Sequence, residues 1–157
     1  MRIEQLQGSH SRVGFRAGMP SVDRYFRAQA GRDAARGLAA VFVVVLPDDK
    51  LAGFYTLAPA TVLLPDLLSG GIRKISRYPA LPAARLTRLA VDKRQRGQGL
   101  ARAMLQDAMA RLVESRLKPV ALIAEAPVEA ARHFYAHAGF QAFPERAHQL
   151  FRPLRAT

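Results

Sequence analysis

The sequence predicts an α/β fold with a mixed, mostly antiparallel central sheet flanked by helices. Short apolar runs such as residues 40–46 alternate with longer segments, such as residues 99–117, that repeat apolar residues at helical spacing. The turn-forming residues 47–50 join the first run to the next, residues 51–57, which is typical of an antiparallel hairpin. Half of the residues are hydrophobic, so a single domain over residues 1–157 can bury a core.

The first half of the chain predicts three strands and one long helix. Ser21 is expected to cap the helix, because its hydroxyl can accept a hydrogen bond from a free N–H of the first turn. Asp23 lies in that turn, where the helix dipole favours a carboxylate. The expected elements are strands over residues 1–7, 40–46 and 51–57 and a helix over residues 22–36.

The second half opens on residues 58–82, which contain four of the ten prolines and the pair Gly70 and Gly71. This composition predicts a loop-rich insertion with a short helical turn near residues 66–69. Pro127 suits the first turn of a later helix, and Gly139 suits its end. The expected elements after the loop are strands over residues 84–91, 120–124, 141–143 and 148–152 and helices over residues 99–117 and 127–137.

The composition excludes several classes of protein. Because the chain has no cysteine, it has neither a disulfide framework nor a cysteine nucleophile. No apolar run approaches the ~20 residues that span a bilayer, and residues 1–7 lack the apolar segment of a signal peptide. A cytoplasmic protein without a membrane segment is the expectation.

The charge is strongly positive and unevenly placed. The formal net charge is +12, from 24 Lys and Arg against 12 Asp and Glu. Residues 73–102 carry nine basic residues and one acid, and residues 1–46 carry seven basic residues and three acids. Phosphate contacts release counterions, so this surplus favours a polyanionic partner. The competing explanation is a source proteome that simply prefers arginine.

The strand over residues 84–91 leads into a basic turn, residues 94–99, that opens the helix over residues 99–117. A helix start exposes unsatisfied backbone N–H groups and carries a partial positive charge. Gly97 and Gly99 allow a sharp turn and a close approach of the backbone to a ligand. The turn is therefore expected to bind a phosphate or a pyrophosphate.

Two other phosphate-binding turns do not fit. A Walker loop requires Lys-Ser or Lys-Thr, which the sequence lacks, and a dinucleotide fingerprint requires a third glycine where Arg102 stands. The pattern Arg94-Gln-Arg-Gly-Gln-Gly99, between Leu-Ala-Val-Asp92 and Leu100-Ala-x-x-Met-Leu, resembles the coenzyme A pyrophosphate loop of the GNAT superfamily of acyl-CoA N-acyltransferases. The resemblance implies the GNAT fold and acetyl-CoA as acetyl donor. A plain basic turn before an ordinary helix is the alternative.

The resemblance also implies which residues hold the donor. In the superfamily the pantetheine arm lies along the strand before the loop, which implies contacts at Leu89, Ala90 and Val91. The resemblance further implies that the pyrophosphate is bound by residues of the turn and the helix start: Arg96, Gly97, Gln98, Gly99, Leu100 and Ala101.

Acylation of an amine requires a neutral amine, a polarised thioester carbonyl and a proton for the departing thiolate. The segment Phe134-Tyr135-x-x-x-Gly139-Phe140 resembles the C-terminal motif of the superfamily, in which a tyrosine hydroxyl often lies near the CoA sulfur. A phenol with a pKa of about 10 is protonated at neutral pH, so Tyr135 is the expected general acid. Packing beside Phe134 is its alternative role.

No side chain stands out as a general base. Glu125 follows the strand over residues 120–124 and could relay a proton, although a surface role fits it equally well. An α-amino group, with a pKa of about 7.7–8.0, needs no strong base, unlike a lysine amine near about 10.4. His133 and His137 lie four residues apart without a third ligand at suitable spacing, so no metal is expected.

Further segments narrow the resemblance. Phe15-Arg-Ala-Gly18, Val22-Asp-Arg-Tyr-Phe26 and Gly53-Phe-Tyr-Thr-Leu-Ala58, together with Phe134-Tyr135, look like the GNAT toxins of type II toxin–antitoxin modules. That resemblance implies acetylation of the α-amino group of aminoacyl-tRNA, inhibition of translation and a ribbon-helix-helix antitoxin as partner. Direct transfer in a ternary complex is the expected mechanism.

The expected tRNA contacts lie on the first helix and before the glycine-containing turn: Arg24, Arg27, Arg32, Arg36, Arg73, Lys74, Arg77, Arg85 and Arg88. Two alternatives stay open. One is a GNAT enzyme for a small-molecule, polyamine or protein amine, and the other is a catalytically silent module that binds acyl-CoA or nucleic acid. The oligomeric state is open as well, with a homodimer as one option.

Overall fold

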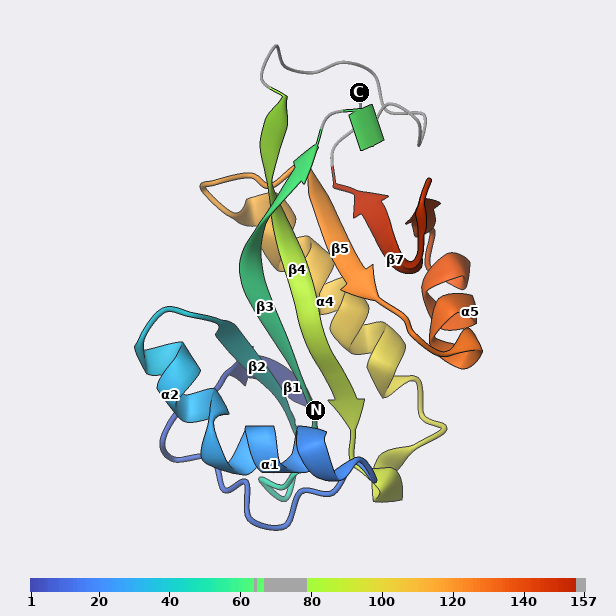
Figure 1. Cartoon of the computed structure of the whole chain (residues 1–157). Helices are drawn as coiled ribbons and strands as arrows, with labels where there is room; N and C mark the ends of the chain where they lie inside the picture. Colours follow the sequence, from blue (N-terminus) through green and yellow to red (C-terminus); the bar gives the residue numbers. More distant parts are fainter. Residues whose placement is uncertain (64, 67–78, 155–157) are drawn as a thin grey trace. The chain divides into compact units, whose positions relative to one another are not determined.

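The computed structural model describes residues 1–63, 65–66 and 79–154, and Figure 1 shows the path of the chain. The strands are β1 (Arg2–Gln5), β2 (Ala40–Val45), β3 (Leu51–Leu63), β4 (Ala80–Val91), β5 (Ala121–Glu125), β6 (Gln141–Phe143) and β7 (Arg146–Pro153). The helices are α1 (Pro20–Ala28), α2 (Ala30–Ala35), α4 (Leu100–Glu114) and α5 (Glu129–His137), with a short 3₁₀ turn, η1 (Lys93–Gln95). No helix in these ranges is long and apolar enough to cross a membrane.

The strands form one mixed sheet in the order β1-β2-β3-β4-β5-β7-β6. β2 pairs antiparallel with both β1 and β3, and β7 pairs antiparallel with both β5 and β6. β4 and β5 run parallel, with Ala84, Arg85 and Leu86 opposite Leu122, Ile123 and Ala124. The predicted mixed, mostly antiparallel sheet is therefore confirmed.

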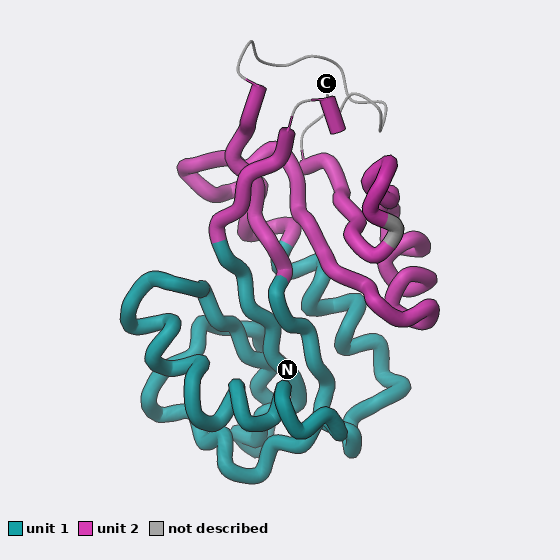
Figure 2. Tube along the Cα trace, in the orientation of Figure 1, with its two compact units in different colours: residues 1–58, 87–108 teal, residues 59–86, 109–157 magenta. Residues whose placement is uncertain are grey.

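The chain forms two compact units, shown in different colours in Figure 2. Unit 1 contains residues 1–58 and 87–108, and unit 2 contains residues 59–86 and 109–157. The core of unit 1 is aromatic: the rings of Phe26 and Phe54 stack at 4.1 Å, and Phe15 meets both edge-on. In unit 2, Phe143 and Phe151 pack at 4.7 Å within an apolar cluster that also contains Val62, Leu81, Ala83, Val120, Ala121 and Ile123.

The helix predicted over residues 22–36 is two helices, α1 and α2, that break at Gln29. Met19 and not Ser21 is the N-cap of α1, because Pro20 occupies the first helical position with its φ already suited to a helix. Gln29 leaves the helical region at φ −122°, and its side chain joins Tyr25 in hydrogen bonding to Asp33. These two hydrogen bonds connect α2, through Asp33, to the end of α1 and to Gln29 at the break.

Two strands extend into the segment that was predicted to be a loop. β3 runs to Leu63 and β4 begins at Ala80, because buried Val62 and Leu81 continue the apolar face on which the core of unit 2 packs. The turn predicted near residues 66–69 lies outside the described residues apart from Asp66. Smaller differences concern α4, which ends at Glu114, and Pro127, which lies just before the N-cap of α5.

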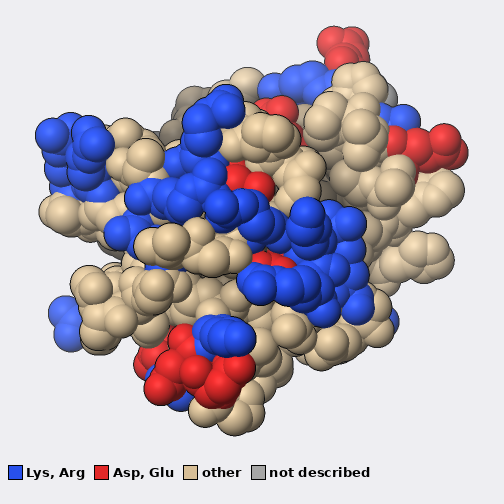
Figure 3. Space-filling view, turned by 90° about the horizontal axis from the view of Figure 1, so that it is seen from below, with Lys and Arg blue, Asp and Glu red and all other residues tan. Residues whose placement is uncertain are grey.

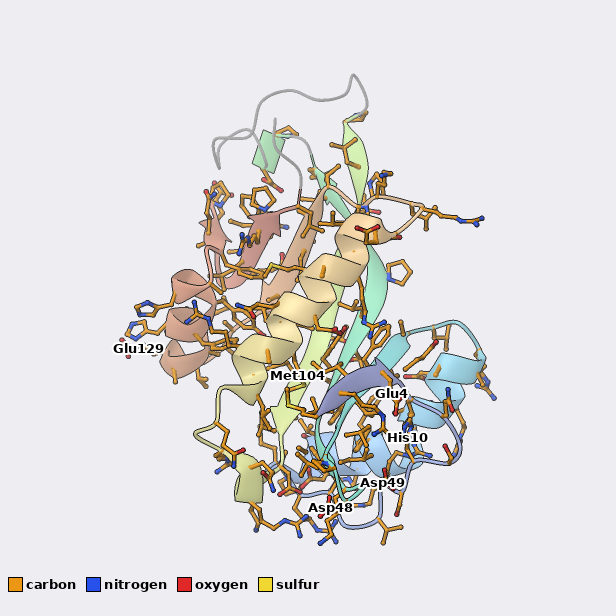
Figure 4. All side chains as sticks on the ribbon, turned by 180° about the vertical axis from the view of Figure 1, so that it is seen from behind. Glu4, His10, Asp48, Asp49, Met104 and Glu129 are labelled. Carbon is orange, nitrogen blue, oxygen red and sulfur yellow. The ribbon has the colours of Figure 1, made fainter. Side chains whose placement is uncertain are left out.

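Helix α4 packs closely on the sheet of unit 1 at Gly53. A Cβ on Gly53 would lie 2.9 Å from Cε of Met104 and 3.0 Å from the carbonyl oxygen of Ala90, so a larger residue would push Met104 and the Ala90 carbonyl aside (Figure 4 labels Met104). The hydroxyl of Tyr55 donates to Asp107 of the same helix at 2.6 Å. This contact fixes α4, and with it the start of the helix, against β3.

We expect Gly53→Val to lower the free energy of unfolding by about 1–3 kcal/mol, because the branched side chain overpacks the Met104 contact. Urea unfolding followed by circular dichroism measures the change. Gly8→Val is the matched control, because no atom lies within 4 Å of a Cβ placed there. Equal stability of the two variants would contradict the close-packing role of Gly53.

Candidate functional site

The turn after β4, residues 94–99, has two glycines in the left-handed region. Gly97 has φ +78° and Gly99 has φ +75°, and no atom lies within 4 Å of a Cβ placed on either. Glycine is therefore required here by the backbone conformation and not by crowding. We call residues 94–99 the glycine turn.

The helix that follows the glycine turn begins with free amides. The first helical hydrogen bond runs from the N–H of Ala103 to the carbonyl of Gly99. Over the described ranges, no protein acceptor takes the N–H groups of Gly99, Leu100, Ala101 or Arg102. Gly97, Gln98 and Gly99 are exposed. Free amides at the positive end of a 15-residue helix suit an anion.

The long side chains of the glycine turn mostly contact protein. Arg94 donates to both carboxylate oxygens of Asp92 at 2.9 Å and to the carbonyl of Gly14 at 2.9 Å. Arg96 donates to the carbonyl of Ala17, and Gln98 donates to Gln95. The backbone amides, more than these side chains, are thus free for a ligand.

The C-terminal end of β4 extends beyond its pairing with the parallel strand β5. The register with β5 ends at Leu86, and residues 87–91 continue in unit 1 toward the glycine turn. Leu89 and Val91 are half-buried, and Ala90 is buried in the aromatic core. The predicted donor-binding residues of the strand and of the turn are thus contiguous within one unit.

Tyr135 lies in unit 2 on α5, with its ring 5.1 Å from the rings of both Phe134 and Phe140. The side chain is 8% exposed, and burial raises the pKa of its phenol to about 12. Among the described residues, no group hydrogen-bonds the Tyr135 hydroxyl. A phenol that stays protonated and has a free hydroxyl can donate a proton to a ligand.

Glu125, the other candidate for proton transfer, is already paired. Its Oε1 accepts hydrogen bonds from Arg85 at 3.1 Å and from Gln149 at 3.2 Å. The charge of Arg85, one of the predicted tRNA contacts, is therefore paired with a carboxylate. Glu125 is therefore arranged as a surface ion-pair partner.

The basic residues predicted to contact tRNA fall into different environments. Arg24, Arg32 and Arg36 are exposed, whereas Arg27 donates to the carbonyl of Phe15 at 3.3 Å. Arg73, Lys74 and Arg77 lie outside the described residues. Figure 3 shows Lys and Arg side chains over much of one face, with one cluster of acidic atoms beside them and smaller acidic groups among them.

Arg88 differs from the other described basic candidates because its side chain stacks on an aromatic ring. Its guanidinium carbon lies 3.4 Å from the centroid of the Tyr25 ring, which is a cation–π contact. The Tyr25 hydroxyl donates to Asp33 at 2.8 Å, and desolvation, followed by this bond, raises the pKa of Tyr25 to about 12. The sequence did not indicate this stack, because Tyr25 and Arg88 are far apart along the chain.

The histidine pair considered for a metal does not gather further ligands. His133 lies 3.7 Å from Glu129, one helical turn away, and both side chains are largely exposed (Figure 4 labels Glu129). Within the part of the chain that the structure describes, no group of three His, Cys, Asp or Glu side chains could hold a metal ion.

The fold and the glycine turn define the class of protein. The acetyltransferase (GNAT) family model matches residues 6–140, and the chain belongs to this family. A tRNA-acetylating toxin of Mycobacterium tuberculosis strain H37Rv is 35% identical over 134 residues, which cover 84% of this chain and 79% of the relative.

Two solved structures are similar over almost the whole chain. AtaT complexed with acetyl-methionyl-tRNAfMet has a TM-score of 0.88 and 24% identity, covering 97% of this chain and 94% of that one. A tyrosine-to-phenylalanine mutant of the AtaT toxin, bound to acetyl-CoA and the C-terminus of the antitoxin AtaR, has a TM-score of 0.79 and 22% identity, covering 98% and 92%. At these identities the two structures confirm the GNAT fold.

Proposed function

We propose that this chain is an acetyl-CoA-dependent N-acetyltransferase that acetylates the α-amino group of aminoacyl-tRNA and thereby blocks translation as a toxin. The observation that carries the proposal is 35% identity to a tRNA-acetylating toxin across 84% of the chain. The net charge of +12 supports a polyanionic substrate. The structure of AtaT with acetyl-methionyl-tRNAfMet supports the same substrate class.

The donor half of the proposed site is the glycine turn with the start of α4. The free amides of Gly99, Leu100 and Ala101 suit the diphosphate of coenzyme A, and the open space over Gly97 and Gly99 lets a phosphate approach the backbone. Arg96 and Gln98 flank these amides. Leu89, Ala90 and Val91 would offer backbone groups to the pantetheine arm. Acetyl-CoA supplies the activated acetyl group as a thioester.

Tyr135 is proposed as the general acid. Its buried ring holds the phenol in the neutral form, and its hydroxyl has no acceptor among the described residues, so its proton is available for the leaving sulfur. The AtaT structure with acetyl-CoA and the C-terminus of AtaR is of a mutant in which a tyrosine is replaced by phenylalanine.

The acceptor amine explains why no strong base is needed. The α-amino group of an aminoacyl ester has a pKa at or below about 7.7–8.0, so a large fraction is neutral at physiological pH. Because Glu125 is paired with Arg85 and Gln149, we propose that solvent water, and not Glu125, takes the proton from the α-amino group. A lysine ε-amine would lack this advantage.

The partner and location follow from the same class. AtaT has been solved with the C-terminus of its antitoxin AtaR, and we propose a small ribbon-helix-helix antitoxin for this chain as well. A toxin of translation works in the cytoplasm, where tRNA is charged. We further propose that the two compact units act as one acetyltransferase domain over residues 1–157.

A direct assay tests the function. Purified protein with labelled acetyl-CoA should transfer label to aminoacyl-tRNA and not to the same tRNA after deacylation, and it should stop translation in an extract only when acetyl-CoA is present. Label on polyamines, small amines or protein N-termini, with aminoacyl-tRNA untouched, would reject the tRNA substrate but keep the acetyltransferase class.

Arg88 should contribute more to tRNA binding than an exposed arginine does. Because the Tyr25 stack already orders Arg88, binding costs it less side-chain entropy, and we expect Arg88→Ala to raise KM for aminoacyl-tRNA by about tenfold. Arg24→Ala, which removes an exposed arginine of α1, should raise it by only about twofold. Both variants should keep the wild-type Kd for coenzyme A, measured by calorimetry. Equal effects on KM would contradict the special role of the stack.

A further inference from the structure

We infer that Asp92 is a positioning residue for acetyl-CoA: its carboxylate joins segment 14–18 and the glycine turn into one hydrogen-bonded unit that holds the phosphate-binding amides in place. The inference deepens the donor half of the proposed function and rests on it, but it does not depend on the identity of the acceptor amine.

Asp92 is the centre of a dense set of hydrogen bonds. Its side chain is 1% exposed. The carboxylate accepts from the backbone N–H of Arg94 at 2.9 Å, from the Arg94 guanidinium at 2.9 Å on each oxygen, and from the backbone N–H of Arg16 at 3.1 Å. The hydrogen bonds from Arg94 come first among the causes that lower the pKa of Asp92 to about 2. Asp92 is thus ionised at any working pH.

The same contacts tie down segment 14–18 from several sides. Arg94 donates to the carbonyl of Gly14, and the N–H of Lys93 donates to the carbonyl of Arg16 at 2.8 Å. Arg96 donates to the carbonyl of Ala17, whose N–H donates to the buried carboxylate of Asp23 at 2.8 Å. Segment 14–18 is therefore held between α1 and the glycine turn.

Gly18 shows how closely the two segments fit. It has φ +89°, and a Cβ on it would lie 2.9 Å from Nη2 of Arg96. The Arg96 side chain therefore lies directly against the backbone of segment 14–18. Contacts at Gly14, Arg16, Ala17 and Gly18 make this a continuous seam rather than a single bridge.

The seam assigns Arg94 a different role from that of a phosphate ligand. Its Nε and Nη2 atoms are occupied by Asp92 and Gly14, and its charge is balanced by a carboxylate at 2.9 Å. A guanidinium fork matches a carboxylate in two parallel hydrogen bonds, which lysine cannot reproduce. Arg94 therefore acts through its shape as well as its charge.

If Asp92 orders the glycine turn in advance, loss of Asp92 should weaken the binding of coenzyme A. A turn that is already fixed pays no ordering entropy when its amides meet a diphosphate, whereas a loosened turn must be ordered on binding. The chemical step at saturating donor depends on groups elsewhere and should change little. The signature of a positioning role is thus a raised Kd for coenzyme A with kcat nearly retained.

The test measures coenzyme A binding by calorimetry and acetyl transfer kinetics for Asp92→Asn. We expect Kd for coenzyme A and KM for acetyl-CoA to rise at least tenfold and kcat to fall less than threefold. Asp33→Asn is the matched control, because Asp33 also accepts side-chain hydrogen bonds in unit 1 but none from the glycine turn. Its Kd for coenzyme A should stay within twofold of the wild-type value.

Three outcomes would overturn the inference: wild-type coenzyme A affinity in folded Asp92→Asn, an equal loss of affinity in Asp33→Asn, or a loss of kcat with unchanged affinity. If Asp92→Asn fails to fold, Arg94→Lys decides, since it keeps the positive charge and loses the fork. A rise in its Kd of at least fivefold supports the seam, and unchanged affinity overturns it. If wild-type protein binds coenzyme A but acetylates no aminoacyl-tRNA, the proposed acceptor fails and this inference does not.

Discussion

Tyr135→Phe should lower kcat for acetyl transfer at least about tenfold while leaving the Kd for coenzyme A unchanged, because the variant loses only the proton donor. General-acid catalysis is typically worth ~10²–10⁴ in rate, so a larger loss is consistent with the same role. The ring keeps its packing between Phe134 and Phe140, which makes the exchange conservative for the fold. Steady-state kinetics with aminoacyl-tRNA and calorimetry with coenzyme A measure the two quantities. A variant with full turnover would remove Tyr135 from the mechanism.

The raised pKa of Tyr135 adds a second readout. Since burial raises this pKa from 10.0 to about 12, the phenol stays protonated across the range in which the enzyme is assayed, and kcat should show no falling limb from Tyr135 below about pH 10. The folded state binds this proton more tightly than the unfolded state does. Its contribution to stability is therefore complete below pH 10 and is lost as pH rises toward 12. Tyr135→Phe should reduce that alkaline loss of stability.

Gly99→Asp should abolish detectable binding of coenzyme A. The substitution puts a side chain on a backbone at φ +75°, and it adds a negative charge beside the free amides that are proposed to hold the diphosphate. Calorimetry on folded protein measures the binding, and thermal unfolding reports the integrity of the fold. Gly97→Asp should behave in the same way, because Gly97 has φ +78°.

Gly37→Asp separates the effect of charge at the phosphate site from that of backbone strain. Gly37 also has a left-handed backbone, at φ +71°, and no atom lies within 4 Å of its Cβ position, but it follows α2 and is not in the glycine turn. This control should lose some stability and keep its affinity for coenzyme A. If both variants bound coenzyme A as the wild-type protein does, the placement of the pyrophosphate on the glycine turn would be wrong.

Local patterns predicted much of the fold. The valine-rich run of β2, the turn at residues 47–50 and the short strand β6 lie where the sequence placed them, because apolar runs and turn residues act over a few neighbours. The break at Gln29 was missed, since it depends on side-chain bonds to Asp33 that periodicity does not encode. The extensions of β3 and β4 were missed because prolines suggested loops, whereas buried Val62 and Leu81 continue the core.

The geometry of the glycine turn was predicted for the same reason. A glycine turn after a strand is a local pattern, so Gly97 and Gly99 could be found and the structure gives both a left-handed backbone. The contacts of Arg94 and Arg96 with segment 14–18 could not be found, because the carbonyl acceptors of Gly14 and Ala17 lie about eighty positions earlier in the chain. Asp92 directly before a basic turn was the one local hint, as a carboxylate that accepts the N–H two residues later.

The close contact between Gly53 and Met104 means that oxidation of Met104 can report the opening of α4. Its thioether is fully buried beneath the strand, so peroxide can reach the sulfur only when α4 separates from the sheet. The rate of sulfoxide formation at this position, followed by mass spectrometry, would therefore report local opening of α4, the helix that begins at the proposed phosphate site. Reburial of the polar sulfoxide beneath Gly53 would be unfavourable, so oxidation of Met104 would loosen α4 and, with it, the proposed donor site.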